Sequence, residues 1–217
     1  MLLDFGLTEW FTGLAILIIL LPILGRRKHS LSYLFFFSAF WIYLLVLVSV
    51  TIFPIPLHVG DAGFRFDSVW DQIAHMQRFH GINLIPLYFD TCWNLPRPCA
   101  IGIYQNILMT VPFGFGISFI MRLKPRDLPW LAVALGLTIE TAQFALDLVM
   151  GGGYRTVDVN DVLFNAMGVL LGYGMFRVFA WLYLATTRHF GITPKGLLAY
   201  IYDVASQTQK AELPNLK

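Results

Sequence analysis

The residues best suited to chemistry in this sequence are polar side chains that stand inside apolar segments. Glu140 and Gln143 are three residues apart and would share one face of a helix. Asp161 and Asn165, four residues apart, would share a face of a second helix, and Asn106 stands in a third apolar segment. A carboxyl or carboxamide group is costly to bury in a membrane, so it usually binds a ligand, carries a proton or bonds another helix.

Three acids are candidates for a catalytic role. Glu140 could act as a general acid or base, while Asp158 and Asp161 could position a metal ion or a substrate hydroxyl. Arg155 could then bind a phosphate group. The sequence shows no clear pairing of a nucleophile with a base, which favours a binding site over an enzyme. We expect no cofactor and no resident metal, because the chain has no nucleotide-binding or metal-ligand spacing.

Several of these residues also have a purely structural interpretation. Asp161 begins an apolar segment and could cap its helix, and Asn165 could bond a neighbouring helix. Arg155 could simply pair with Asp158. The motif Gly168-x3-Gly172 is typical of closely packed membrane helices. A packing role and a site role are therefore both open for these residues.

The composition indicates what kind of protein positions these groups. Of the 217 residues, 57% are apolar and 13% are charged, and the net charge is +2. A soluble domain carries about twice that share of charge and could not bury so much apolar surface. The small net charge also excludes a basic nucleic-acid binder. The chain is therefore expected to be an all-α integral membrane protein.

Five segments are long and apolar enough to cross a bilayer, which takes about 20 residues each. Their approximate bounds are 8–25, 31–54, 104–121, 129–150 and 161–184. The predicted fold is thus a five-helix transmembrane bundle. The chain divides into the first two spans (1–54), an outer loop (55–103), a three-helix core (104–184) and a cytoplasmic tail (185–217).

Lysine and arginine are distributed unevenly between the two sides of this bundle. Ten of them lie in the connections after the first and third spans and in the tail, against four on the other side. Positive residues favour the cytoplasmic side of a membrane. We therefore expect the N-terminus outside the cell and the C-terminus in the cytoplasm.

The outer loop is too apolar for a simple linker. Residues 67–79 have the spacing of a short amphipathic helix, which would be a strut packed on the spans or, less readily, a lid over a site. Cys92 and Cys99 stand on the outer side, where a disulfide and two free thiols are both open. Pro96 and Pro98 between them indicate a turn.

The polar residues of the last three spans all lie in their outer halves in this topology. A random scatter would occupy both halves, and the inner halves are almost bare of such residues. We infer a polar pocket that opens outward, walled by these three spans and roofed by the outer loop. Its expected binding residues are Asn83, Gln105, Asn106, Glu140, Gln143, Arg155, Asp158, Asp161 and Asn165.

Four sequence blocks resemble the VanZ-like family, which is named for a teicoplanin resistance protein. They lie within residues 83–173 and read NLIPL (83–87), QNILMTVPFGF (105–115), Glu140-x-x-Gln143 and RTVDVNDVLFNAMGVLLGY (155–173). The family often has an acid where this chain has Asn160, which weakens a metal site built on successive acids. The resemblance implies a bacterial membrane protein linked to resistance against glycopeptides, and it implies an association rather than a reaction.

Three functions are open on this basis. The first is a non-enzymatic protein of the bacterial cell membrane whose pocket binds a membrane lipid, a lipid-linked envelope intermediate or a lipoglycopeptide. The second is a membrane enzyme that modifies an envelope lipid or glycan with Glu140, Asp158 and Asp161. The third is a structural subunit in which the polar residues only bond helices together. No nucleic-acid partner is expected.

Overall fold

The structure is a computed structural model that describes residues 2–56, 70–71, 73, 82–89, 96–149 and 156–212. Most of these residues are helical. The helices are α1 (Leu7–Arg26), α2 (Leu31–Ile52), α5 (Pro96–Gly116), α6 (Leu128–Val149), α7 (Val159–His189) and α8 (Leu197–Glu212), with a short 3₁₀ helix η1 (Ile117–Phe119) after α5. Of the amphipathic helix predicted at 67–79, Trp70, Asp71 and Ile73 are described and helical, and the rest lies outside the described residues.

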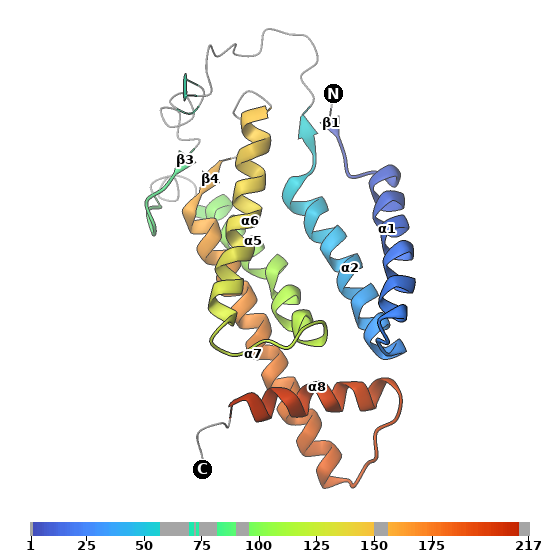
Figure 1. Ribbon diagram of the computed structural model, residues 1–217. Helices are drawn as coiled ribbons and strands as arrows, with labels where there is room; N and C mark the ends of the chain where they lie inside the picture. Colours follow the sequence, from blue (N-terminus) through green and yellow to red (C-terminus); the bar gives the residue numbers. More distant parts are fainter. Residues whose placement is uncertain are drawn as a thin grey trace.

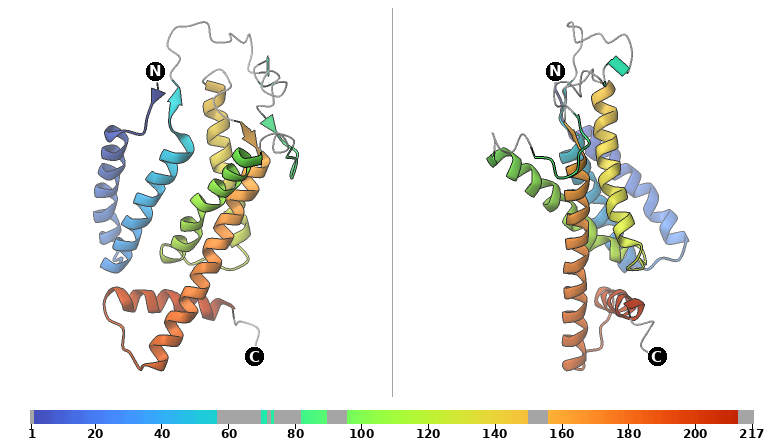
Figure 2. Two further views of the ribbon diagram at one scale, coloured as in Figure 1. Left: turned by 180° about the vertical axis from the view of Figure 1, so that it is seen from behind. Right: turned by 90° about the vertical axis from the view of Figure 1, so that its left-hand side faces the viewer.

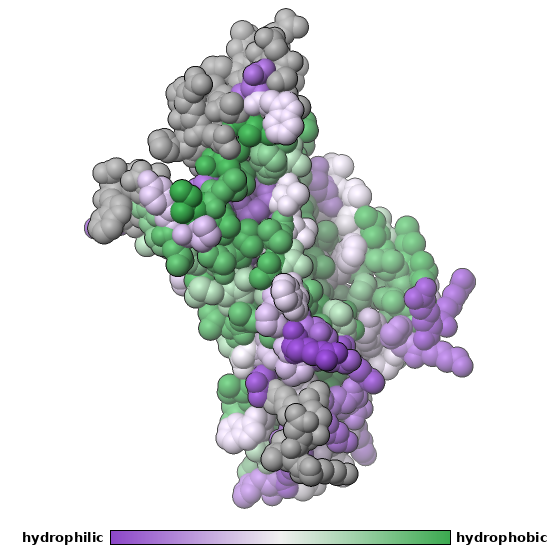
Figure 3. Space-filling view, turned by 60° about the vertical axis from the view of Figure 1, so that its left-hand side comes forward, coloured by the Kyte–Doolittle hydropathy of each residue, from purple (hydrophilic) through white to green (hydrophobic). Residues whose placement is uncertain are grey.

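Five helical segments in the described part of the chain are long and apolar enough to cross a membrane: α1, α2, α5 with η1, α6 and α7. Figure 1 shows them as a bundle, with α8 lying across one end. Large apolar side chains such as Phe11, Ile18 and Leu137 are exposed on the outer faces of these helices. In Figure 3, apolar residues cover the middle of the molecule and hydrophilic residues gather below them. The prediction of an all-α, five-helix membrane bundle is confirmed.

The two ends of the bundle are built differently. At the strand end, β1 (Leu2–Leu3) pairs antiparallel with β2 (Ile55–Pro56), and β3 (Ile82–Asn83) pairs parallel with β4 (Val157–Asp158). At the opposite end, which we call the basic end, lie the α1–α2 turn, the connection from η1 to α6, and α8 (Figures 1 and 2). The three segments in which the sequence concentrates lysine and arginine therefore lie together.

Two glycines bring α5 and α7 into direct backbone contact. A methyl group at Gly168 would lie 2.1 Å from a backbone oxygen of α5, and one at Gly172 would lie 2.0 Å from another. Both distances are far below van der Waals contact, so the helices could not approach this closely with any larger residue. Thr110 of α5 adds a hydrogen bond from its hydroxyl to Asn165 O at 2.8 Å. The packing interpretation of Gly168-x3-Gly172 is confirmed.

The apolar core lies around the lower half of α7 and reaches the basic end. Phe176 of α7 is fully buried, and Phe119 of η1 meets it edge to face with ring centroids 5.2 Å apart. The ring of Phe36 of α2 stacks on the ring of Phe119, with the two centroids 4.3 Å apart. Ala205 of α8 is also buried against the core. The aromatic cluster thus ties α2, α7 and α8 together at one level.

Two features of the helices differ from the sequence-based expectations. α5 begins at Pro96, so the interpretation of Pro96 and Pro98 as a turn is wrong. The first N–H groups of a helix have no partner within it, so proline fits the first turn without losing a hydrogen bond. α7 continues to His189, and α8 then forms within the segment interpreted as a tail.

Candidate functional site

The start of α7 is organised by the carboxylate of Asp158. Its Oδ1 accepts hydrogen bonds from Asn160 N at 2.8 Å and from Asn83 Nδ2 at 2.9 Å. The first bond caps the helix, and the second joins α7 to the strand β3. The interpretation of Asp161 as the cap is wrong, because Asp161 already lies in the first helical turn.

Residues 82–89 form a turn that rests on the start of α7. Asn83 Oδ1 accepts a hydrogen bond from Ile85 N at 3.1 Å, and Asn83 Nδ2 also donates to Tyr88 O at 3.3 Å. A local bond from an asparagine side chain to its own backbone is typical of turns. Asn83 therefore both shapes the turn and fastens it to Asp158.

Asn160 is a site residue that the sequence does not reveal. Its side chain is only 1% exposed. Its Oδ1 accepts from Leu87 N at 2.6 Å, and its Nδ2 donates to Tyr88 O at 3.0 Å. An ionised acid at this position could accept the first bond but could not donate the second. The one hint in the sequence is that Asn160, a neutral amide, stands between two acids, Asp158 and Asp161, at the start of α7.

Glu140 lies beside the start of α7 and contributes to the same set of bonds. Its side chain is 6% exposed, and its Oε2 accepts from Asp158 N at 3.3 Å. From Glu140, α6 runs on to Val149, about 14 Å further at 1.5 Å per residue. Figure 1 shows α6 extending past β4 in this direction. Glu140 is therefore far from the C-terminal end of its own helix but level with the start of α7.

A cavity of about 240 Å³, which we call the strand-end cavity, lies next to these bonds. Its polar lining includes Asn106, Asp158 and Asp161, and the Asn106 amide donates a hydrogen bond to the Asp161 carboxylate. Its apolar lining includes Phe89 and Phe164, whose rings stack with centroids 6.2 Å apart. The described lining comes from α5, α7, the residues just before α7 and the 82–89 turn. The cavity therefore sets carboxylates beside an aromatic surface.

The other predicted site residues that the structure describes do not line this cavity. Gln143 is buried and donates from Nε2 to Thr51 O at 2.9 Å, which bonds α6 to α2. Gln105 is exposed on α5. Asn165 is fully buried, and its side-chain amide has no hydrogen-bond partner within the described part of the chain. Arg155 lies outside the described residues.

The sequence leaves open whether the cysteines are free thiols or form a disulfide, and the structure answers this for Cys99. Cys99 lines the strand-end cavity and is disulfide-bonded. The chain has one further cysteine, Cys92, which lies outside the described residues. Among the described residues, no three His, Cys, Asp or Glu side chains are grouped so as to hold a metal ion.

The fold and this site together define a multi-pass α-helical membrane protein with an acidic cavity at one end of its bundle. A model of the VanZ/LLP1 family matches residues 40–180, which is well over half of the chain, so the chain belongs to this family. It is a VanZ-like membrane protein of a family associated with glycopeptide resistance. The resemblance seen in the sequence is confirmed. No curated protein and no solved structure matches the chain.

Proposed function

We propose that this chain is a protein of the bacterial cell membrane whose strand-end cavity faces outward and binds the polar part of an envelope lipid, a lipid-linked precursor or a lipoglycopeptide. The observation that carries the proposal is the lining of the cavity. Asn106, Asp158 and Asp161 meet there beside the rings of Phe89 and Phe164. Convergent polar groups within an apolar wall are typical of sites for amphiphilic small molecules.

The distribution of positive charge supports an outward-facing cavity. The strand end lies opposite the basic end, where the α1–α2 turn, the connection after η1 and α8 lie together (Figure 1). Positive residues in short connections favour the cytoplasmic side. The strand end then faces the cell envelope, where glycopeptides and their lipid-linked targets meet the membrane.

The charges in the cavity favour a ligand that donates hydrogen bonds. Asp158 Oδ1 already accepts two bonds within the protein. Asp161 is half-buried and also lines the cavity. Carboxylates attract hydroxyl and ammonium groups and repel phosphate. A sugar hydroxyl or an amine of the ligand therefore fits this cavity better than a phosphate does.

A membrane enzyme is the second candidate, because two acids, Asp158 and Asp161, line one cavity. Glu140 is not part of the described lining, and its Oε2 accepts a backbone hydrogen bond. A general acid or base must reach the substrate directly or through one water, so this position favours a structural role. The variant Glu140→Gln keeps an acceptor for Asp158 N. A binding protein would keep its function in this variant, and an enzyme that uses Glu140 would lose it.

The experiment is a titration of the full chain in lipid nanodiscs with teicoplanin and, separately, with a lipid-linked peptidoglycan precursor. Wild type is compared with Asp161→Asn and with the control Asp127→Asn, which removes an exposed acid at the basic end. We expect one of the two ligands to bind, and Asp161→Asn to weaken it about tenfold, as for a lost hydrogen bond to a charged group. Failure of both ligands to bind, or unchanged binding by Asp161→Asn, would contradict the proposal.

A further inference from the structure

A cavity of about 780 Å³ lies at the basic end, away from the site above. We call it the basic cavity. Three segments distant in sequence surround it: the α1–α2 turn with Lys28, the connection after η1 with Arg122 and Lys124, and α8 with Lys210. Figure 1 shows these segments side by side at the lower end of the bundle.

The basic cavity has an excess of positive charge. Its described lining holds four permanent cations, Lys28, Arg122, Lys124 and Lys210, and a single carboxylate, Asp203. Within the part of the chain that the structure describes, none of the four cations forms a salt bridge; the ion pair found there joins two other residues. Cations gathered with so little counter-charge create a positive potential that attracts an anion.

A buried hydroxyl points to the same kind of ligand. Ser118 lines the basic cavity, and its Oγ is buried without a hydrogen-bond partner among the described residues. A buried polar group in this state costs free energy unless a ligand or water bonds to it. Phosphate oxygens would accept a hydrogen bond from this hydroxyl. The cavity therefore offers both a donor and positive charge to an oxyanion.

The basic cavity lies at the level where the membrane spans end. Phe119 is the last residue of the span formed by α5 and η1, and Tyr33 stands in the first turn of α2; both line the cavity. Phospholipid headgroups occupy this level of a bilayer. Leu197 and Leu198, at the start of α8, are exposed apolar residues, as expected for a helix at a membrane surface.

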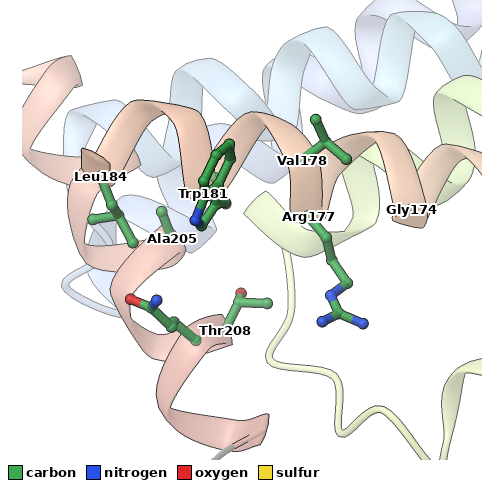
Figure 4. Close-up of a pocket in the computed structure, with 9 residues that line it drawn as sticks. Gly174, Arg177, Val178, Trp181, Leu184, Ala205 and Thr208 are labelled. Atoms are coloured by element: carbon green, nitrogen blue, oxygen red, sulfur yellow. The ribbon is translucent and has the colours of Figure 1, made fainter. Parts of the chain in front are cut away.

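An apolar groove adjoins the basic cavity. A second cavity of about 420 Å³ lies between α7 and α8, and Thr208 lines both cavities. Figure 4 shows Val178, Trp181 and Leu184 of α7 at this groove. An acyl chain can pack against such a surface, whereas a free phosphate ion has no apolar part that could do so. The neighbouring groove therefore favours a lipid over a soluble anion.

We infer that the basic cavity binds the phosphate of an anionic phospholipid headgroup. Arg122 and Lys124 attract the phosphate, and Ser118 Oγ donates a hydrogen bond to it. The bound lipid bridges α8 to the connection after η1 and so holds α8 against the end of the bundle. This site is separate from the strand-end cavity, and its existence does not depend on the function proposed there.

The test measures the unfolding temperature of the full chain in neutral detergent, from its tryptophan fluorescence, as phosphatidylglycerol is added. The test variant is Arg122→Gln with Lys124→Gln. The matched control is Arg126→Gln with Lys195→Gln, which removes the same charge from residues of the basic end that do not line the cavity. We expect the test variant to need about tenfold more phosphatidylglycerol than wild type for the same stabilisation, and the control to match wild type.

Three results would overturn the inference. The first is an equal loss of the response to phosphatidylglycerol in the test and control variants. The second is that phosphatidylcholine stabilises wild type as much as phosphatidylglycerol does. The third is that soluble glycerol phosphate does so, which would make the ligand a free anion. Should the double variant fail to fold, Ser118→Ala decides, because it removes only a hydroxyl that has no hydrogen-bond partner among the described residues. A weaker response to phosphatidylglycerol in Ser118→Ala supports the site, and an unchanged response overturns it.

Discussion

Asn160, in the first turn of α7, accepts a hydrogen bond of 2.6 Å from the backbone N–H of Leu87, 73 residues away in the sequence. Leu87 has a φ of +61°, a left-handed conformation that is rare for leucine. Such a conformation costs about 1–3 kcal/mol and persists only where its surroundings hold it. The Asn160 side chain is that support, and the turn it holds supplies Tyr88 and Phe89 to the strand-end cavity.

Replacing Asn160 should therefore destabilise the protein. Asn160→Asp keeps the acceptor for Leu87 N but loses the donor to Tyr88 O and buries a charge. Asn160→Ala loses both bonds. We expect each variant to lose about 1–3 kcal/mol of stability, since Asn160→Asp buries a charge at a position that is 1% exposed and Asn160→Ala loses both hydrogen bonds. Unfolding of the purified protein in detergent measures this, and a wild-type midpoint for both variants would show that the turn does not depend on Asn160.

Replacing Asp158 should destabilise the protein, whereas replacing Asp161 should not. Asp158→Ala removes the helix cap and the bond from Asn83, so we expect a loss of about 1–3 kcal/mol. Asp161→Asn keeps a polar side chain of the same shape in the first turn and should unfold near the wild-type midpoint. Equal destabilisation by the two changes would mean that Asp161 is also a structural residue.

The close contact of α5 and α7 gives a prediction with an internal control. A methyl group at Gly172 would lie 2.0 Å from Val111 O, so Gly172→Ala must push the two helices apart. We expect a loss of about 1–3 kcal/mol, as for an overpacked core. Gly174→Ala, two residues away, meets nothing within 4 Å and should be neutral or slightly stabilising. Equal unfolding midpoints for the two variants would contradict this packing.

The orientation of the chain can be tested with fusions at its C-terminus. The gathering of lysine and arginine at the basic end predicts that this end faces the cytoplasm. A green fluorescent protein fused after Lys217 should therefore fluoresce, and alkaline phosphatase at the same place should be inactive. The reverse pattern would turn the strand-end cavity toward the cytoplasm and remove the basis for an outward-facing site.

Much of the fold was predictable because membrane spans are long and apolar. The five spans and the packing of Gly168-x3-Gly172 follow from composition and spacing, and the structure confirms both. α8 was not predictable in the same way, because it is short and more polar, and it is held by contacts such as that of Ala205 with the core.

The site was predictable only in part, because spacing along one helix says nothing about its neighbours. Asn106, Asp158 and Asp161 do meet at one cavity. Gln143 lies on the same helix face as Glu140, yet it bonds Thr51 of α2. The role of Asn160 was not predictable, because it depends on a turn about 70 residues earlier in the chain.

The most direct test of the central claim is the teicoplanin inhibitory concentration of a susceptible bacterium that expresses this chain. Wild type, Asp161→Asn and the control Asp127→Asn are compared at equal amounts of protein in the membrane. The proposed function predicts that wild type and the control raise the inhibitory concentration and that Asp161→Asn does not. Resistance that is unchanged in Asp161→Asn, or absent in wild type, would contradict a role for the strand-end cavity in glycopeptide resistance.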